Sequence, residues 1–158
     1  MKGDMLVKLY NLKDNFDYDE LESNGIMIKR ALPMDKSKIL EYIKNEFSIN
    51  RADECDVIFS NKPISTFIAV KDKKVVGFAC YEATAKGFFG PTGVSENLRG
   101  KGVGTALLMK SLLSMREEGY AYAIIGWVDD AMEFYKKTVD AQVIEDSFPG
   151  VYSRRING

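Results

Sequence analysis

The feature that most constrains the fold is a glycine-rich turn between a β-prone run and a long helical run. Residues 88–94 are predicted to form a strand, and Gly100, Gly102 and Gly104 precede or open a helix predicted over 102–116. Residues 120–128 are apolar on both faces, as in a strand that is buried from both sides. Two such strands joined through a helix pair in parallel, with a right-handed crossover. The sequence therefore predicts a strand–helix–strand unit at the centre of the fold.

The remaining segments predict an otherwise antiparallel sheet in one domain. The fold class is α/β: a mixed, mostly antiparallel sheet with a central parallel βαβ unit and helices on both faces. Residues 1–158 are expected to form a single domain, in which 1–24 are an N-terminal extension and 25–156 are the core. The other expected elements are strands at 6–10 and 26–31, helices near 35–47 and 51–59, a hairpin of 66–70 with 75–81, a short helix ending near 138, and a closing antiparallel pair at 142–145 and 151–155.

Composition excludes several kinds of chemistry. The 158 residues contain no histidine, which removes Ser-His-Asp and Cys-His catalysis and histidine metal sites. Two cysteines, Cys55 and Cys80, are too few for a zinc site and lie in apolar contexts, so both are expected to be buried thiols, and no metal is expected. With 22 basic and 23 acidic side chains, the chain lacks the basic excess that non-specific nucleic-acid binding needs.

The sequence also predicts no membrane partner. No run approaches the ~20 apolar residues that a membrane span requires. The first 20 residues mix charges throughout and do not resemble a signal peptide. We therefore expect a soluble, cytoplasmic protein.

The glycine-rich turn is suited to an anion. The first N–H groups of a helix have no partner within it and lie at the positive end of its dipole, and Arg99 and Lys101 add positive charge. A P-loop is excluded, because Gly102 follows Lys101 where Ser or Thr is required. A dinucleotide fingerprint fits Gly100 and Gly102 but has Thr105 in place of the third glycine. The pattern R-x-x-G-x-G/A is met by Arg99, Gly102 and Gly104.

The last pattern, with its position after the strand at 88–94, resembles the acetyl-CoA-binding motif of the GNAT N-acetyltransferase superfamily. The resemblance covers residues 26–156 in element order. It implies that this strand splays from the strand at 123–128, that pantetheine pairs with backbone near Val94, and that the pyrophosphate lies on the amides of residues 100–105. The cofactor-binding residues so implied are Val94, Arg99, Gly100, Lys101, Gly102, Val103, Gly104 and Thr105.

A second stretch, Ala131-Met132-Glu133-Phe134-Tyr135-Lys136-Lys137, is similar to a stretch that follows the fifth strand in this superfamily. The resemblance gives Tyr135 the role of general acid toward the departing thiolate of coenzyme A. Many relatives carry an asparagine seven residues earlier, on the pantetheine arm. Val128 stands there in this chain, so the resemblance does not carry that contact over.

The resemblance implies an acetyltransferase, and the chemistry then requires a base for the acceptor amine. Without histidine, the candidates are carboxylates or ordered water: Glu82, at the end of a predicted strand, is the nominated residue, and Asp129 and Asp130 follow the fifth strand. The predicted reaction is direct transfer of acetyl from acetyl-CoA to a primary amine of a small molecule. An amino sugar is indicated, because the runs FFGPTGV and PGVY resemble acetyltransferase modules found beside bacterial amino-sugar glycosidases.

Two other functions stay open. One is a non-catalytic acyl-CoA-binding or sensing module on the same fold, and the other is a nicotinamide dinucleotide binder. The sequence also leaves open whether the chain forms a homodimer.

Overall fold

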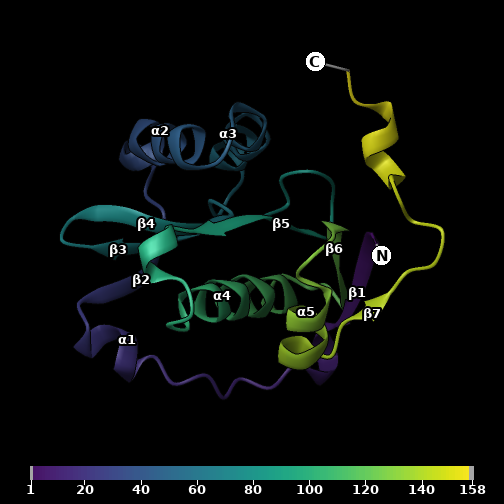
Figure 1. The fold of residues 1–158 in the computed structure, drawn as a ribbon, viewed down its shortest axis with the longest axis horizontal. Coiled ribbons are helices and arrows are strands. Elements are labelled where there is room, and N and C mark those ends of the chain that lie inside the picture. Colours follow the sequence, from purple (N-terminus) through teal and green to yellow (C-terminus); the bar gives the residue numbers. More distant parts are fainter. Residues whose placement is uncertain (1, 157–158) are drawn as a thin grey trace.

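The computed structural model describes residues 2–156, which form one seven-stranded sheet (Figure 1). The strands lie in the order β2-β3-β4-β5-β6-β1-β7. Among the strand pairs of these residues, β5–β6 is parallel and the others are antiparallel. The predicted mixed, mostly antiparallel sheet with a central parallel pair is thereby confirmed. The strands are β1 (Gly3–Lys8), β2 (Ile26–Arg30), β3 (Thr66–Lys71), β4 (Lys74–Tyr81), β5 (Phe88–Val94), β6 (Tyr122–Val128) and β7 (Gln142–Val143).

Helices cover both faces of the sheet. In Figure 1, α2 and α3 lie on one face, and α4 and α5 lie on the other. None of the helices formed by residues 2–156 is both long enough and apolar enough to cross a membrane. The helices are α1 (Asp19–Ser23), α2 (Lys36–Glu46), α3 (Ile49–Asp56), α4 (Val103–Glu117) and α5 (Met132–Val139).

Helix α4 connects β5 to β6 and fills the larger of two hydrophobic cores. Its Leu107 side chain is fully buried among residues of the sheet. The opposite side of α4 is covered by the chain that leaves β1: Arg116 donates from Nη1 to the carbonyl oxygens of Leu9 and Leu12, at 3.4 and 2.8 Å. Because α4 is enclosed from two sides, its position relative to β5 and β6 is tightly fixed.

Helices α2 and α3 build the second core on the other face. Ile43 of α2 and Cys55 of α3 pack against Phe78 and Cys80 of β4. Both cysteines are buried free thiols, as predicted. Helix α3 begins after Ser48, whose Oγ accepts the N–H of Arg51 at 3.1 Å as an N-cap.

The first strand lies inside the sheet rather than beside it. β1 occupies Gly3–Lys8, slightly earlier than the predicted 6–10, and runs between β6 and β7. It pairs with β6 along its length, from Gly3 opposite Val128 to Lys8 opposite Tyr122. The segment treated as an extension in the sequence therefore contributes a strand that supports β6.

The predicted closing pair of strands at 142–145 and 151–155 is wrong. β7 has two residues and pairs with β1, while Gly150–Arg154 form a 3-10 helix. The rings of Phe148 and Tyr152 pack edge-on against Trp127, with centroids 5.5 and 4.9 Å away. These contacts draw the chain over the face of the sheet that carries α3, and away from the edge where a strand would pair (Figure 1).

The α4 core gives a first prediction. Leu107→Ala is expected to lower the free energy of unfolding by about 2–5 kcal/mol, because the fully buried side chain leaves a cavity. Urea denaturation measures the change. Leu32, with 47% of its side chain exposed, supplies the matched control, and Leu32→Ala should cost less than about 0.5 kcal/mol. Equal losses in the two variants would contradict the assignment of Leu107 to the core.

Candidate active site between β5, β6 and the start of α4

The turn before α4 exposes backbone amides. Gly100 and Gly102 have φ angles of +79° and +86°, a left-handed region that favours glycine. Gly102 is the N-cap of the 15-residue α4, and its carbonyl oxygen accepts the Ala106 N–H at 3.0 Å. The amides of Val103, Gly104 and Thr105 find no acceptor among the described residues. Three adjacent N–H groups at a helix N-terminus form an anion-binding geometry.

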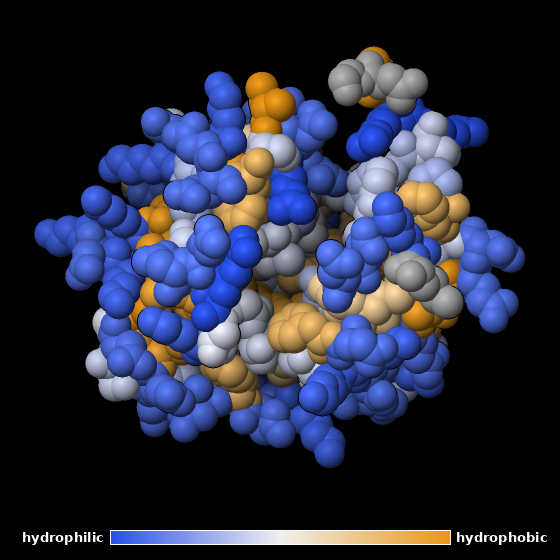
Figure 2. Space-filling view, viewed as in Figure 1, coloured by the Kyte–Doolittle hydropathy of each residue, from blue (hydrophilic) through white to orange (hydrophobic). Residues whose placement is uncertain are grey.

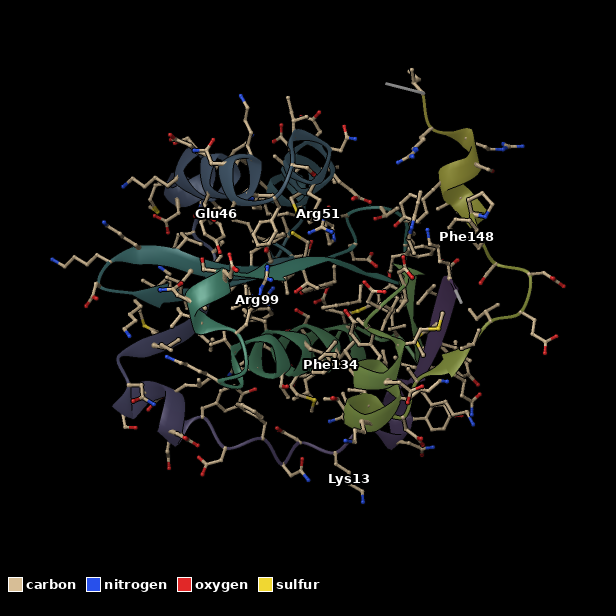
Figure 3. The ribbon with its side chains drawn as sticks, viewed as in Figure 1. Lys13, Glu46, Arg51, Arg99, Phe134 and Phe148 are labelled. Atoms are coloured by element: carbon tan, nitrogen blue, oxygen red, sulfur yellow. The ribbon has the colours of Figure 1, made fainter. Side chains whose placement is uncertain are left out.

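The turn also lies next to the end of β5. Arg99 donates from Nε to the carbonyl oxygen of Val94 at 3.2 Å, which fixes the side chain along the strand (Figure 3). A Cβ built on Gly104 would lie 3.8 Å from Val94 Cγ2. The Arg99 and Lys101 side chains are both exposed. The structure thus brings the eight predicted cofactor-binding residues to one place, with positive charge at the rim.

The parallel pair β5–β6 separates after two residues. Phe88 and Phe89 lie opposite Ile124 and Ile125, and no further β5–β6 pair is formed within the described chain. The strand β5 instead follows β4, with an irregularity in register where Gly90 and Pro91 face one residue of β4. The splay that the sequence resemblance implied is confirmed.

A bulge in β6 holds the other side of the opening. Trp127 has a φ angle of +48°, and its N–H donates to Oδ1 of Asp4 at 3.0 Å. Asp4 is 8% exposed and lies where one residue of β1 faces two of β6. The carboxylate therefore replaces the backbone acceptor that the bulge removes.

A cavity of about 990 Å³ lies at this opening. Its walls come from α3, β5, β6, the start of α5 and the C-terminal segment, which we define as residues 148–156. In Figure 2 the surface is hollowed between the helices of the upper face and this segment. The volume is large enough for a small organic molecule together with part of a second ligand.

Tyr135 lines the cavity from α5. The side chain is 7% exposed and packs edge-on against Phe89, with ring centroids 6.5 Å apart. Burial raises the pKa of Tyr135 to about 12, and the Arg51 guanidinium across the cavity opposes that rise. The phenol is therefore protonated at neutral pH and available as a donor toward the opening.

Glu82 lies in the turn between β4 and β5. Its carboxylate accepts the N–H of Gly87 at 2.5 Å and the hydroxyl of Tyr120 at 2.7 Å. That hydrogen bond raises the pKa of Tyr120 to about 12. Glu82 is not among the residues that line the cavity, whereas Asp129 and Asp130 are. The Glu82 carboxylate is therefore hydrogen-bonded within the turn, and the cavity does not include the residue that the sequence nominated as base.

Sequence reasoning missed the residues that α3 and the C-terminal segment bring to the cavity. Arg51 and Glu54 project from α3, and Glu54 Oε2 accepts a hydrogen bond from the hydroxyl of Thr84. Tyr152 reaches in from the C-terminal segment, with its hydroxyl 2.9 Å from where a Cβ on Gly126 would lie. The one available signal was that Arg51 and Glu54 are three apart and share a helix face.

An amide-lined turn beside an opening between two parallel strands is suited to a long, phosphate-bearing ligand that is bound through the backbone. The model of the acetyltransferase (GNAT) family matches residues 35–140, more than half of the chain. The chain belongs to this family, whose members are acetyl-CoA-dependent acetyltransferases. The resemblance found in the sequence is confirmed.

Solved structures share the fold at low identity. One is the glucosamine N-acetyltransferase region of a fungal multi-domain beta-N-acetylglucosaminidase, with a TM-score of 0.73, 12% identity, and 90% of this chain and 20% of that chain covered. Another is a GNAT protein from Sphaerobacter thermophilus, with a TM-score of 0.67, 19% identity, and 90% and 48% covered. A Trypanosoma brucei acetyltransferase has a TM-score of 0.61 and 18% identity, with 84% and 99% covered.

These comparisons establish the fold and the family. The chain spans about a fifth of the first of these proteins and about half of the second. No curated protein matches the chain.

The Trp127 bulge generates a second prediction. Asp4→Ala should lower the free energy of unfolding by about 1–3 kcal/mol, because it leaves the Trp127 N–H without its acceptor. Asp4→Asn retains an oxygen that can accept the Trp127 N–H, so its free energy of unfolding should fall by less. Trp127 is the single tryptophan, so its fluorescence during urea denaturation reports on the bulge directly. Wild-type stability in Asp4→Ala would show that the bulge does not depend on this bond.

Proposed function

We propose that the chain transfers the acetyl group of acetyl-CoA directly to a primary amine of a small molecule. The observation that carries this proposal is the run of unpaired amides at Val103, Gly104 and Thr105, next to the opening between β5 and β6. Family membership supports the reaction class.

The turn fits the diphosphate of coenzyme A. A diphosphate needs several converging donors, and the amides of residues 103–105 supply them at the positive end of a 15-residue helix. Arg99 and Lys101 add charge at the rim. Because the donors belong to the backbone, the glycine at position 102 matters more than the side chains around it. Bound in this way, acetyl-CoA supplies the acetyl thioester.

The acceptor amine must lose a proton before it attacks. An ammonium group with a pKa of ~10.4 costs roughly 4–5 kcal/mol to deprotonate at pH 7. We assign the role of base to Glu54, directly or through one water, because its partly buried carboxylate lines the cavity. Thr84 donates a hydrogen bond to one oxygen, which leaves the other for the amine.

Tyr135 acts on the leaving thiolate. With its pKa at about 12, the phenol is a weaker acid than a thiol of pKa ~8.5 by roughly 3.5 units, which makes complete proton transfer unfavourable by about 5 kcal/mol. Tyr135 is therefore assigned as a hydrogen-bond donor that stabilises the departing sulfur, and solvent completes the protonation.

An amino sugar remains the first acceptor to test. The sequence resemblance points to it, and the fold is shared with a glucosamine N-acetyltransferase region at 12% identity. Release of free thiol from acetyl-CoA with a panel of amines measures the activity. Tight binding without turnover of any amine would instead favour a sensing module.

The diphosphate site gives a third prediction. Gly102→Glu should weaken acetyl-CoA binding by at least about 100-fold, because it places bulk and a negative charge on the amides that would hold the diphosphate. Isothermal titration calorimetry with acetyl-CoA measures the loss.

Gly25 supplies the matched control. It has a φ angle of +78°, close to that of Gly102, and a Cβ built on it meets no atom within 4 Å. Gly25→Glu should carry the same backbone strain and still bind acetyl-CoA. Normal binding by Gly102→Glu, or binding of NAD in place of acetyl-CoA, would reject the proposed site.

The fourth prediction separates two tyrosines of similar acidity. Tyr135→Phe should lower kcat by about 10- to 1,000-fold with little change in the Kd for acetyl-CoA, because only the donor to the leaving group is lost. Tyr120, whose pKa is also about 12, does not line the cavity, so Tyr120→Phe should keep kcat within about twofold. Unchanged turnover in Tyr135→Phe would remove it from the mechanism.

The fifth prediction concerns the base. Glu54→Gln should reduce kcat/KM strongly at neutral pH and recover part of it as the pH rises, since more of the amine is then neutral. Glu82→Gln should affect stability and leave the pH profile unchanged, because its carboxylate bonds within the turn. The opposite result would assign the base to Glu82.

A further inference from the structure

The proposed acceptor cavity carries guanidinium groups without carboxylate partners. Arg51 of α3, and Arg154 and Arg155 of the C-terminal segment, all line it. Residues 2–156 form four ion pairs, and none of them includes these arginines. All three arginines are exposed, so they lie where the cavity meets solvent, and guanidinium groups without a carboxylate partner are suited to bind an anion there.

Two of these side chains are held by aromatic rings. The Cζ atom of Arg155 lies 4.9 Å from the centre of the Trp127 ring, and that of Arg51 lies 5.7 Å from the centre of the Phe47 ring. Figure 3 shows Arg51 below α3, toward the sheet, with Phe148 of the C-terminal segment across the gap. Stacking restricts the side chains, so less entropy is lost when they bind a ligand.

The acidic residues of the cavity do not neutralise the three arginines. Asp129 forms an ion pair with Lys2 at 3.6 Å. Glu54 accepts the hydrogen bond from Thr84, and Asp130 forms no ion pair within the described chain. The charges facing an acceptor are therefore three cations, Glu54 and Asp130.

Helix α3 presents one charge of each sign to the cavity. Arg51 and Glu54 are three residues apart on one helix face, a spacing at which ion pairs commonly form. They form none here, since Glu54 is directed to Thr84 and Arg51 packs on Phe47. The Glu54 carboxylate and the Arg51 guanidinium therefore remain separate. One can bind a positively charged group of a ligand while the other binds a negatively charged group of the same ligand.

We infer that the acceptor is a small primary amine that also carries a phosphate or a carboxylate. This inference rests on the proposed function. Glu54 receives the amine, and Arg51, Arg154 and Arg155 bind the anionic group between α3 and the C-terminal segment. Bidentate hydrogen bonds from guanidinium groups suit both anions.

Matched acceptors test the inference. The pairs are ethanolamine with phosphoethanolamine, glucosamine with glucosamine 6-phosphate, and β-alaninamide with β-alanine. Values of kcat/KM are measured at saturating acetyl-CoA and corrected for the fraction of each acceptor whose amine is unprotonated. In at least one pair the anionic member should be favoured by about tenfold or more, and the phosphate and carboxylate arms identify the anion. Added salt should reduce the preference.

Arginine variants locate the binding groups. Arg51→Gln and the double variant R154Q/R155Q should each raise KM for the anionic acceptor by about tenfold. KM for the matched acceptor without the anionic group should stay within about twofold of the wild-type value. Lys13→Gln, which removes one positive charge as Arg51→Gln does but on the exposed stretch between β1 and α1, should alter neither value. Equal losses for both members of a pair would mean that the arginines serve the fold and not the anion.

A binding measurement avoids dependence on turnover. Inorganic phosphate could also occupy the amides before α4, so the Gly102→Glu protein is used to block that turn. Because Arg155 stacks on the single tryptophan, phosphate bound in the cavity should change Trp127 fluorescence, and R154Q/R155Q in this background should abolish the change.

The outcomes distinguish the two proposals. Equal kcat/KM for neutral and anionic acceptors would overturn this inference and leave the acetyltransferase intact. Failure to bind acetyl-CoA would overturn the proposed function, whatever phosphate does in the cavity. A fluorescence change that survives in R154Q/R155Q would contradict the assignment of the anion to the C-terminal arginines.

Discussion

The separation of β5 from β6 after two paired residues is the constraint on which the rest of the site depends. A parallel ladder that stops leaves backbone groups without partners, and a stable protein must satisfy them or place them where a ligand can. In this chain β4 keeps β5 in the sheet beyond the break, and residues of β5 and β6 past the last pair line the cavity. On the other side of β6, the Asp4 carboxylate of β1 accepts the Trp127 N–H at 3.0 Å and supports the β6 bulge. Helix α4, the next α-helix after β5, presents its free amides beside the same gap. The opening and the amide-lined turn therefore lie next to each other at the end of β5.

The two halves of the proposed site offer different kinds of groups to a ligand. At the start of α4 the donors are amides, so their positions depend on the left-handed glycine at 102 and on the burial of α4, and hardly on side-chain identity. Across the opening the groups are side chains: Glu54, Tyr135 and the arginines of α3 and the C-terminal segment. A pKa of about 12 keeps the Tyr135 phenol protonated, and in the proposed reaction, without histidine, the proton of the amine would pass to a carboxylate or to water. The amides at the start of α4 therefore suit one ligand whatever the surrounding side chains are. The groups across the opening depend on side-chain identity, so they change when the sequence changes.

The same division explains what the sequence could predict. Glycine spacing and a 15-residue apolar helix are local signals, so the strand–turn–helix unit and its amides were found with nearly correct limits. The position of β1 between β6 and β7 depends on pairing across more than a hundred residues, which no local pattern records. The tail was predicted as a strand from its β-prone residues, but Phe148 and Tyr152 gain more by packing on Trp127. Glu82 was nominated from its place at the end of a strand, and the sequence gives no sign that Gly87 and Tyr120 hold its carboxylate.

The proposed acceptor site is built from the parts of the chain that carry no motif. Helix α3 is positioned by packing of Cys55 and its neighbours on β4, and the C-terminal segment by aromatic contacts to a bulged residue of β6. Neither arrangement requires a fixed sequence, and the structures that share the fold are only 12–19% identical to this chain. The identity of the acceptor must therefore be inferred from the charges that these two segments bring together. In this chain they bring three guanidinium groups that have no carboxylate partner among residues 2–156, and a carboxylate that is held apart from them by Thr84. An acceptor whose only polar group is its amine would make no use of these guanidinium groups, whereas an acceptor that also carries an anionic group would contact both them and Glu54.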